Sequence, residues 1–145
     1  MKVTRTLLEG AAGTTAMTMF SHMLSRKMQE NYSEPELLGE LVRRGVPGLR
    51  KEHARKAGWA LHYAIGLGMM AGFRAVAKRG GLAKPLVFGI VGGIAGIAAW
   101  RQMFRKHPSP PPADLVGFLT QLLPAHMVFC LPLLFEHTDE KEKRG

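Results

Sequence analysis

Cysteine is almost missing from this sequence, and no catalytic motif can be found in it. Cys130 is the single cysteine among 145 residues. One cysteine excludes an intrachain disulfide and a cysteine-based zinc site, and we expect it to pack as a small apolar residue inside a helix. The chain also has no His-Glu-x-x-His, Gly-x-Ser-x-Gly or Walker motif. We therefore predict that the protein is not an enzyme and holds no metal.

Acidic residues are scarce as well: 11 Asp and Glu stand against 20 Lys and Arg, which gives a net charge of +9. That balance suits either nucleic acid or an anionic membrane surface as a partner. The basic residues, however, occur in pairs at the ends of uncharged stretches, such as Arg26–Lys27, Arg55–Lys56 and Arg105–Lys106. Cations placed there can reach lipid headgroups while the stretch between them lies in hydrocarbon. The pattern favours a lipid bilayer over nucleic acid.

Four stretches with very little charge follow one another along the chain, at residues 6–24, 57–76, 86–101 and 114–135. One membrane crossing takes ~20 apolar residues. We predict an all-α protein, an integral membrane bundle of about four transmembrane helices that forms a single domain over residues 1–145, with a mobile tail at 136–145. Two alternatives stay open. One is a soluble helical domain; the other is a fourth segment that ends near Leu123 and then re-enters, because Pro124 and Pro132 interrupt its hydrogen bonding.

A short amphipathic helix is expected at residues 34–44, between the first two crossings. Its start, Ser33-Glu34-Pro35-Glu36, has the form of a capping box with proline in the first turn. An apolar stripe follows at Leu37, Leu38, Leu41 and Val42. We expect this helix to lie on the membrane interface or against the ends of the crossings. On this interpretation, Glu34 and Glu36 are present because they cap the start of the helix.

Glycines recur at helical spacing in two of the expected crossings. They are Gly68 and Gly72 in the second, and Gly89, Gly92, Gly93 and Gly96 in the third. Glycine at i and i+4 lets another membrane helix approach closely. We predict packing contacts on both faces, either within the chain or with another copy of it.

An ion pair is predicted between Glu9 and Arg74. Glu9 lies one turn inside the start of the first crossing, and Arg74 lies one turn inside the end of the second. Antiparallel crossings bring these two positions to the same membrane surface, where an isolated charge is costly. The alternative is that Arg74 extends into the headgroups.

At the opposite surface, the same topology gathers a cluster of polar and aromatic side chains. Its expected members are His22, His62, Trp100, Arg101 and Asp114, with His126 nearer the middle of the membrane. Hydrogen bonding between helices is one role for the histidines. A proton or ion path through His22, Asp114 and His126 is a second. A haem held by His22 and His62 is a third, although no cofactor is needed to explain the residues.

Several short motifs resemble the YagU-like family of small bacterial inner-membrane proteins. They are Gly10 to Met17, Leu61-His62-Tyr63, the glycine-rich third stretch, Pro111 to Leu115, and Ala125-His126-Met127-Val128. The family often has Gly-His in the last motif, where this chain has Ala125. The resemblance implies a multi-pass protein of a bacterial cytoplasmic membrane and adds little about mechanism.

Together these patterns favour a non-enzymatic accessory or structural subunit that packs against itself or a larger membrane complex. A small proton- or ion-conducting protein and a haem-bearing redox subunit are the alternatives.

Overall fold

The structure is a computed structural model that describes residues 2–76 and 83–134. All regular elements in these two ranges are α-helices: α1 (Lys2–Met28), α2 (Glu34–Gly45), α3 (Lys51–Val76), α4 (Ala83–Lys106) and α5 (Leu115–Phe129). The all-α prediction is therefore confirmed. The tail at 136–145, predicted to be mobile, lies outside the described residues.

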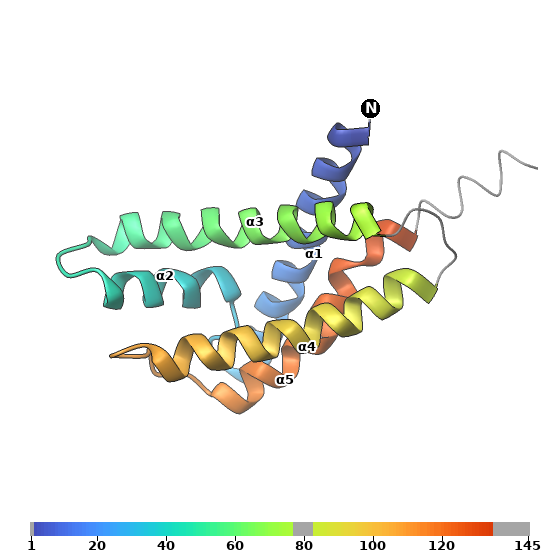
Figure 1. The fold of residues 1–145 in the computed structure, drawn as a ribbon. Helices are drawn as coiled ribbons and strands as arrows, with labels where there is room; N and C mark the ends of the chain where they lie inside the picture. Colours follow the sequence, from blue (N-terminus) through green and yellow to red (C-terminus); the bar gives the residue numbers. More distant parts are fainter. Residues whose placement is uncertain (1, 77–82, 135–145) are drawn as a thin grey trace, which may run out of the picture.

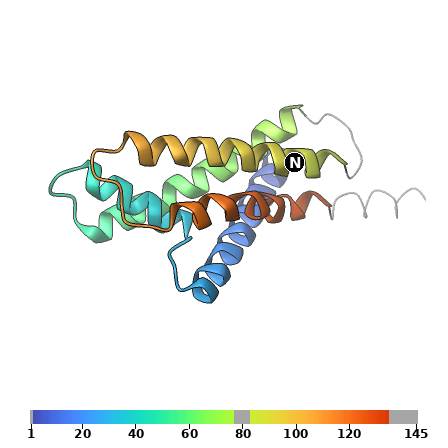
Figure 2. The same cartoon turned by 90° about the horizontal axis from the view of Figure 1, so that it is seen from below.

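The helices form two antiparallel hairpins and one crossing helix (Figure 1). α2 packs along α3, and α4 packs along α5. α1 contacts both α3 and α5, so it joins the two hairpins. Figure 2 shows that α1 crosses the other helices obliquely and that its C-terminal end projects to one side of them.

Two helical stretches in the described chain, Ala83–Lys106 and Leu115–Leu134, are long and apolar enough to cross a membrane. α1 and α3 are as long as α4, but both contain charged or hydroxyl side chains along part of their length. Length and composition thus single out the hairpin of α4 and α5 as the part that could cross a membrane. The wider prediction of four crossings needs a physical account of the polar groups in α1 and α3.

The helix ends differ in part from the capping pattern expected from the sequence. Ser33 stands at the start of α2 but makes no side-chain capping bond. Its backbone carbonyl instead accepts the first helical hydrogen bond, from Leu37 N at 3.0 Å. The predicted capping box is therefore wrong. Asp114 does cap α5, because its carboxylate accepts a hydrogen bond from Gly117 N at 3.1 Å.

Two buried clusters hold the hairpins together. The first is rich in aromatic rings and includes Trp100, whose ring meets that of Phe118 edge to face at 4.8 Å; around them pack Tyr32, Leu37, Leu38, Leu41, Phe104 and Leu122. The second joins α1, α3 and α5 through Met17, Met70, Phe73, Ala125, Phe129, Cys130 and Leu133. Cys130 is buried there.

Glycine gives the helices their closest approaches. A Cβ atom at Gly58 of α3 would lie 2.7 Å from Gly39 Cα of α2, and also against the carbonyl oxygen of Pro35. A Cβ at Gly13 of α1 would meet the backbone carbonyl of Phe129 in α5, and one at Gly66 of α3 would meet the Thr14 hydroxyl of α1. Three of the helix interfaces therefore depend on a missing side chain.

We predict that Gly58→Ala destabilises the protein by at least about 2 kcal/mol, because the added methyl group has backbone on two sides and cannot be accommodated without separating α2 from α3. Gly68→Ala on the same helix is the matched control. A Cβ there meets nothing within 4 Å, so alanine should be neutral or slightly stabilising. Thermal unfolding of detergent-solubilised protein measures both. Equal midpoints for the two variants would contradict the packing described here.

Candidate functional site

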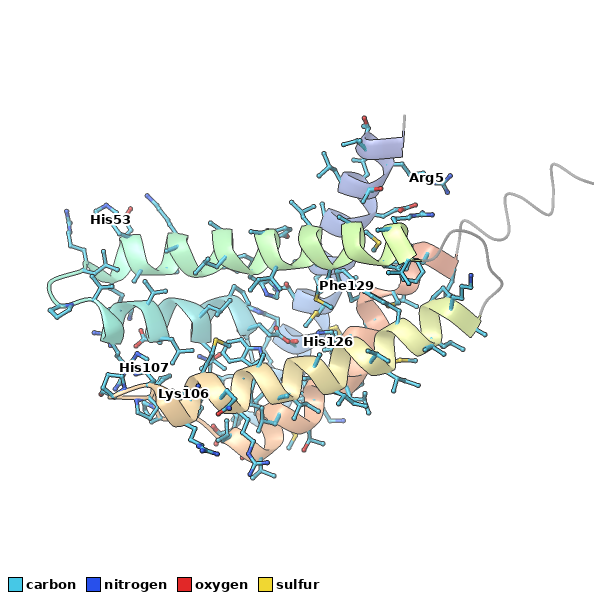
Figure 3. All side chains as sticks on the ribbon, in the orientation of Figure 1. Arg5, His53, Lys106, His107, His126 and Phe129 are labelled. Carbon is cyan, nitrogen blue, oxygen red and sulfur yellow. The ribbon has the colours of Figure 1, made fainter. Side chains whose placement is uncertain are left out.

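A cavity of about 280 Å³ lies between the two hairpins. α3 and α4 form opposite walls. They touch beside the cavity through the rings of Phe73 and Phe88, whose centroids lie 4.8 Å apart, but α3 rests mainly on α1 and α2 whereas α4 rests mainly on α5. Most of the wall is apolar. The polar side chains that line it are Thr14, Glu34, His62 and His126, and Trp100 and Phe129 are its aromatic residues. Figure 3 shows His126 and Phe129 in the middle of the bundle, whereas Arg5, His53 and Lys106 lie at its periphery.

Glu34 is the most buried charged residue described, with 1% of its surface exposed. Its Oε1 accepts a hydrogen bond from the Ser21 hydroxyl of α1 at 2.6 Å and one from the Gln121 amide of α5 at 3.1 Å. Its Oε2 is buried and has no hydrogen-bond partner among the described residues. The carboxyl group therefore links three helices through one oxygen and leaves the other unused.

Burial raises the pKa of Glu34 to about 7, and the bonds from Ser21 and Gln121 only partly offset that effect. A carboxylate removed from water is costly unless charge or several donors compensate it. Glu34 therefore changes between its neutral and ionised forms near neutral pH.

His62 is held by a hydrogen-bond chain on α1. Its Nε2 lies 2.9 Å from the Thr18 hydroxyl oxygen. That hydroxyl donates its own proton to the Thr14 carbonyl at 2.8 Å. Thr18 can then only accept from the imidazole, which places the ring proton on Nε2 and leaves Nδ1 as an acceptor.

His126 has the opposite tautomer. Its Nδ1 lies 2.7 Å from the Leu122 carbonyl oxygen, one turn earlier in α5, and a carbonyl can only accept. The ring proton is on Nδ1, and Nε2 is the acceptor. The ring fits because Gly96 faces it: a Cβ at Gly96 would lie 2.8 Å from His126 Cε1.

The structure brings together three of the six residues that the sequence was predicted to gather in one cluster, and it separates the other three. His62, Trp100 and His126 line one cavity. His22 and Arg101 are exposed, and His22 lines a separate surface pocket. Asp114 is also exposed, and it accepts a hydrogen bond from the Tyr32 hydroxyl at 2.7 Å. The prediction of one common cluster is wrong.

Tyr32 and Asp114 instead form a small clamp between the start of α2 and the start of α5. The hydrogen bond to Asp114, with burial, raises the pKa of Tyr32 to about 12, so its hydroxyl keeps its proton and donates it. A Cβ at Gly117 would collide with both side chains. The clamp positions α5 and hence Gln121, which holds Glu34.

The geometry argues against two of the roles considered for the histidines, haem ligation and a proton or ion path. His22 and His62 line different pockets, so they do not face each other as axial haem ligands must. The path through His22, Asp114 and His126 begins with two exposed side chains and ends at a buried one, and neither exposed residue lines the cavity that His126 lines. The part of the chain that the structure describes contains no group of three His, Cys, Asp or Glu side chains placed to hold a metal ion.

Glu9 and Arg74 lie together, as the sequence predicts. Arg74 Nε donates to Glu9 Oε2 at 3.0 Å, and its terminal nitrogen contacts both carboxylate oxygens. Arg5 adds a bond to Glu9 Oε1 at 2.9 Å, one turn before it on α1. This group ties α1 to the end of α3.

Of the two predicted glycine faces, one makes its contact within the described part of the chain and the other does not. Gly89, Gly92, Gly93 and Gly96 all face α5; a Cβ at Gly93, for example, would lie 3.0 Å from Leu123 Cα. This face is used within the chain. A Cβ at Gly68 or at Gly72 would meet no atom within 4 Å, so the contact predicted for these two glycines is not made inside the described part of the protein.

Glu34 was expected only to cap α2, and its place at the centre of the bundle was missed. The sequence did contain a pattern from which this position could have been predicted. One face of α2 carries residues at i, i+3, i+4 and i+7, namely Glu34, Leu37, Leu38 and Leu41, and this face is buried. A carboxylate on an apolar face needs hydrogen-bond partners, and Glu34 was not connected with the hydroxyl of Ser21 or the amide of Gln121.

Comparisons with protein-family models, with curated proteins and with solved structures find no match. The resemblance to the YagU-like proteins accordingly stays a prediction, and the site must be interpreted from its own chemistry.

We predict that the contribution of Glu34 to the free energy of unfolding declines as pH rises from about 4.5 to about 7, so that the stability difference between wild type and Glu34→Gln shows this decline. The folded state holds the Glu34 proton up to a pH near 7, whereas the unfolded state releases it near the ordinary value; the folded form therefore binds more protons in that window, and its advantage declines as pH rises. The Glu34 contribution is up to roughly 3 kcal/mol.

Unfolding midpoints of both proteins between pH 4.5 and pH 8 test this. Glu36→Gln, on the exposed side of the same helix, removes an equal formal charge and should leave the decline in place. Parallel pH profiles for wild type and Glu34→Gln would show that Glu34 does not titrate as described.

Proposed function

We propose that this chain is a non-enzymatic, multi-pass protein of a bacterial cytoplasmic membrane, a bundle with four crossings that associates with a second copy of itself through α3. The observation that supports it best is the outward face of α4. Leu86, Val87, Ile90, Val91 and Ile94 are each between 44% and 59% exposed. A continuous apolar stripe of this size is unsuited to water and suits lipid.

The polar groups of α1 and α3 are compatible with hydrocarbon because they are satisfied internally. The hydroxyls of Thr14, Thr15 and Thr18 each donate to the carbonyl oxygen four residues earlier on α1. Glu9 and Arg74 neutralise each other. A hydroxyl or charge that already has its partner costs far less in a membrane than an isolated one. These bonds support crossings by α1 and α3 in addition to α4 and α5.

Lengths also agree with this arrangement. α1, α3 and α4 have 27, 26 and 24 residues, so each is ~35–40 Å long at 1.5 Å per residue. A hydrocarbon layer of ~30 Å can be spanned by such helices even when they are tilted. The oblique course of α1 is thus consistent with a crossing.

Association is suggested by the small-residue face of α3, defined as Ala60, Ala64, Gly68 and Gly72. All four residues are exposed and follow one another at a spacing of four. The same spacing in α4 already brings Gly89 and Gly93 against the backbone of α5. A face of this kind is self-complementary, and no charged residue lies between Lys56 and Arg74 to oppose a second copy.

We predict that Gly68→Leu combined with Gly72→Leu converts a dimer into a monomer. A Cβ at either position meets no atom of the chain within 4 Å, so leucine there should extend outward into the interface, and the monomer should keep its free energy of unfolding within about 0.5 kcal/mol of the wild type. Native mass spectrometry from lipid nanodiscs measures the oligomeric state. Gly93→Leu is the control that disturbs folding instead, because its side chain would collide with Leu123.

The membrane assignment has its own test. Washing isolated membranes with alkaline carbonate should leave the protein in the pellet, because integral proteins resist that treatment. Recovery of a monomer in the supernatant without detergent would contradict the membrane proposal, and a wild-type monomer in nanodiscs would contradict the dimer alone.

A further inference from the structure

We propose that the cavity between α3 and α4 binds a primary ammonium group carried on a small apolar body, with Glu34 as its counter-ion and His62 and His126 as further acceptors. The inference goes beyond the association of α3, because the cavity lies within one chain. It rests on three independent features: an excess of acceptors, a missing positive charge, and an apolar wall.

The acceptor excess follows from hydrogen bonds already described. Ring protons of His62 and His126 are directed to Thr18 and to the Leu122 carbonyl, which leaves one bare nitrogen on each ring. Glu34 Oε2 is likewise without a partner in the described chain. The three residues that carry these acceptors all line one cavity, and an ammonium group offers three donors.

The cavity also lacks a positive charge to balance Glu34. No lysine or arginine is among the described residues that line the cavity. Glu34 is hydrogen-bonded by Ser21 of α1 and Gln121 of α5. The other titratable or aromatic side chains that line its cavity from neighbouring helices are His62 of α3, Trp100 of α4, and His126 and Phe129 of α5. A carboxylate in this position must either take up a proton or obtain a positive partner from outside the chain.

The remainder of the wall selects an apolar body. Met17, Leu38, Ile65, Met69, Met103 and Phe129 surround the cavity. Trp100 also lines it, and an indole face attracts an ammonium ion. A volume of about 280 Å³ is just below the ~300 Å³ at which the usual range of ligand pockets starts, so the ligand must be small. The half-exposed side chain of Ile65 marks the opening between α3 and α4, which in a bilayer would face the lipid.

Hexylammonium and 1-hexanol are suitable probes, since they have the same apolar chain and differ in charge. The protein contains two tryptophans, and Trp59 is not among the lining residues, so Trp59→Phe leaves Trp100 as the reporter. Titration into phosphatidylcholine nanodiscs at pH 8 should change Trp100 emission, with hexylammonium binding at least tenfold more tightly than hexanol. Glu34→Gln should abolish this preference while hexanol binding persists.

A second measurement needs no variant at Glu34. The preference of the Trp59→Phe protein for hexylammonium should grow between pH 6 and pH 8.5, because Glu34 ionises near pH 7 while the amine keeps its proton. Equal binding of the two probes, an absence of binding by both, or a preference that survives Glu34→Gln would each overturn the proposal.

The ammonium group could belong to a free amine or to a phosphatidylethanolamine headgroup. Adding that lipid to the nanodiscs distinguishes the two sources. Loss of hexylammonium binding assigns the site to the headgroup, and unchanged binding assigns it to a free amine; both outcomes support an ammonium site. A wild-type monomer in these nanodiscs would count against the α3 dimer and leave this result untouched.

Discussion

Backbone contact at glycine is the constraint on which the rest of this structure depends. Gly58 against Gly39, Gly13 against Phe129, and Gly93 against Leu123 fix how near the helices of three different interfaces can approach. In a membrane, apolar side chains gain little from leaving lipid, so cohesion between helices comes from close packing and from hydrogen bonds. Glycine makes both possible, because it brings carbonyls and hydroxyls of neighbouring helices within reach.

The cavity is a consequence of that packing. Glycine brings backbone against backbone between α2 and α3 and between α4 and α5, whereas α3 and α4 meet through side chains such as Phe73 and Phe88, whose ring centroids lie 4.8 Å apart. The two hairpins are also joined by α1 and by Leu37 of α2, which packs in one cluster with Trp100 and Phe118 of the α4–α5 hairpin, and a space remains between them. Glu34 enters this space from the first turn of α2, and Ser21 and Gln121 reach it from α1 and α5. A polar group at the meeting point of three helices can specify their arrangement, since each helix must be in place for its bonds to form.

Much of the secondary structure could be predicted from the distribution of charge and proline. The short helix expected at 34–44 is observed at Glu34–Gly45, and the expected third stretch lies within Ala83–Lys106. The pairing of Glu9 with Arg74 followed from the depth of each residue in neighbouring antiparallel helices. Matching positions along two antiparallel helices predict a contact of this kind where the helices run alongside each other.

His22 was expected beside His62 and Asp114 on the same grounds, and there the prediction was wrong. It assumed parallel axes, whereas α1 crosses the other helices obliquely and its C-terminal end projects to one side of them (Figure 2). His22 belongs to the C-terminal part of α1 and is exposed. Crossing angles depend on which small residues meet, and the sequence alone does not pair Gly13 with Phe129 or Gly66 with Thr14. Glu34 was missed for a related reason: its capping position was obvious, while its partners Ser21 and Gln121 are 13 and 87 residues away along the chain.

The most direct test of the claim that glycine sets the spacing of the helices is an NMR measurement of the contact between α2 and α3 in lipid. Gly58 and Gly39 lie closer than any side chain would allow, so their Hα protons should show a strong nuclear Overhauser effect in nanodiscs, where the bundle has its proposed solvent. A spectrum in which both residues are assigned and helical but show no such contact would contradict the claim that glycine sets the spacing of these helices.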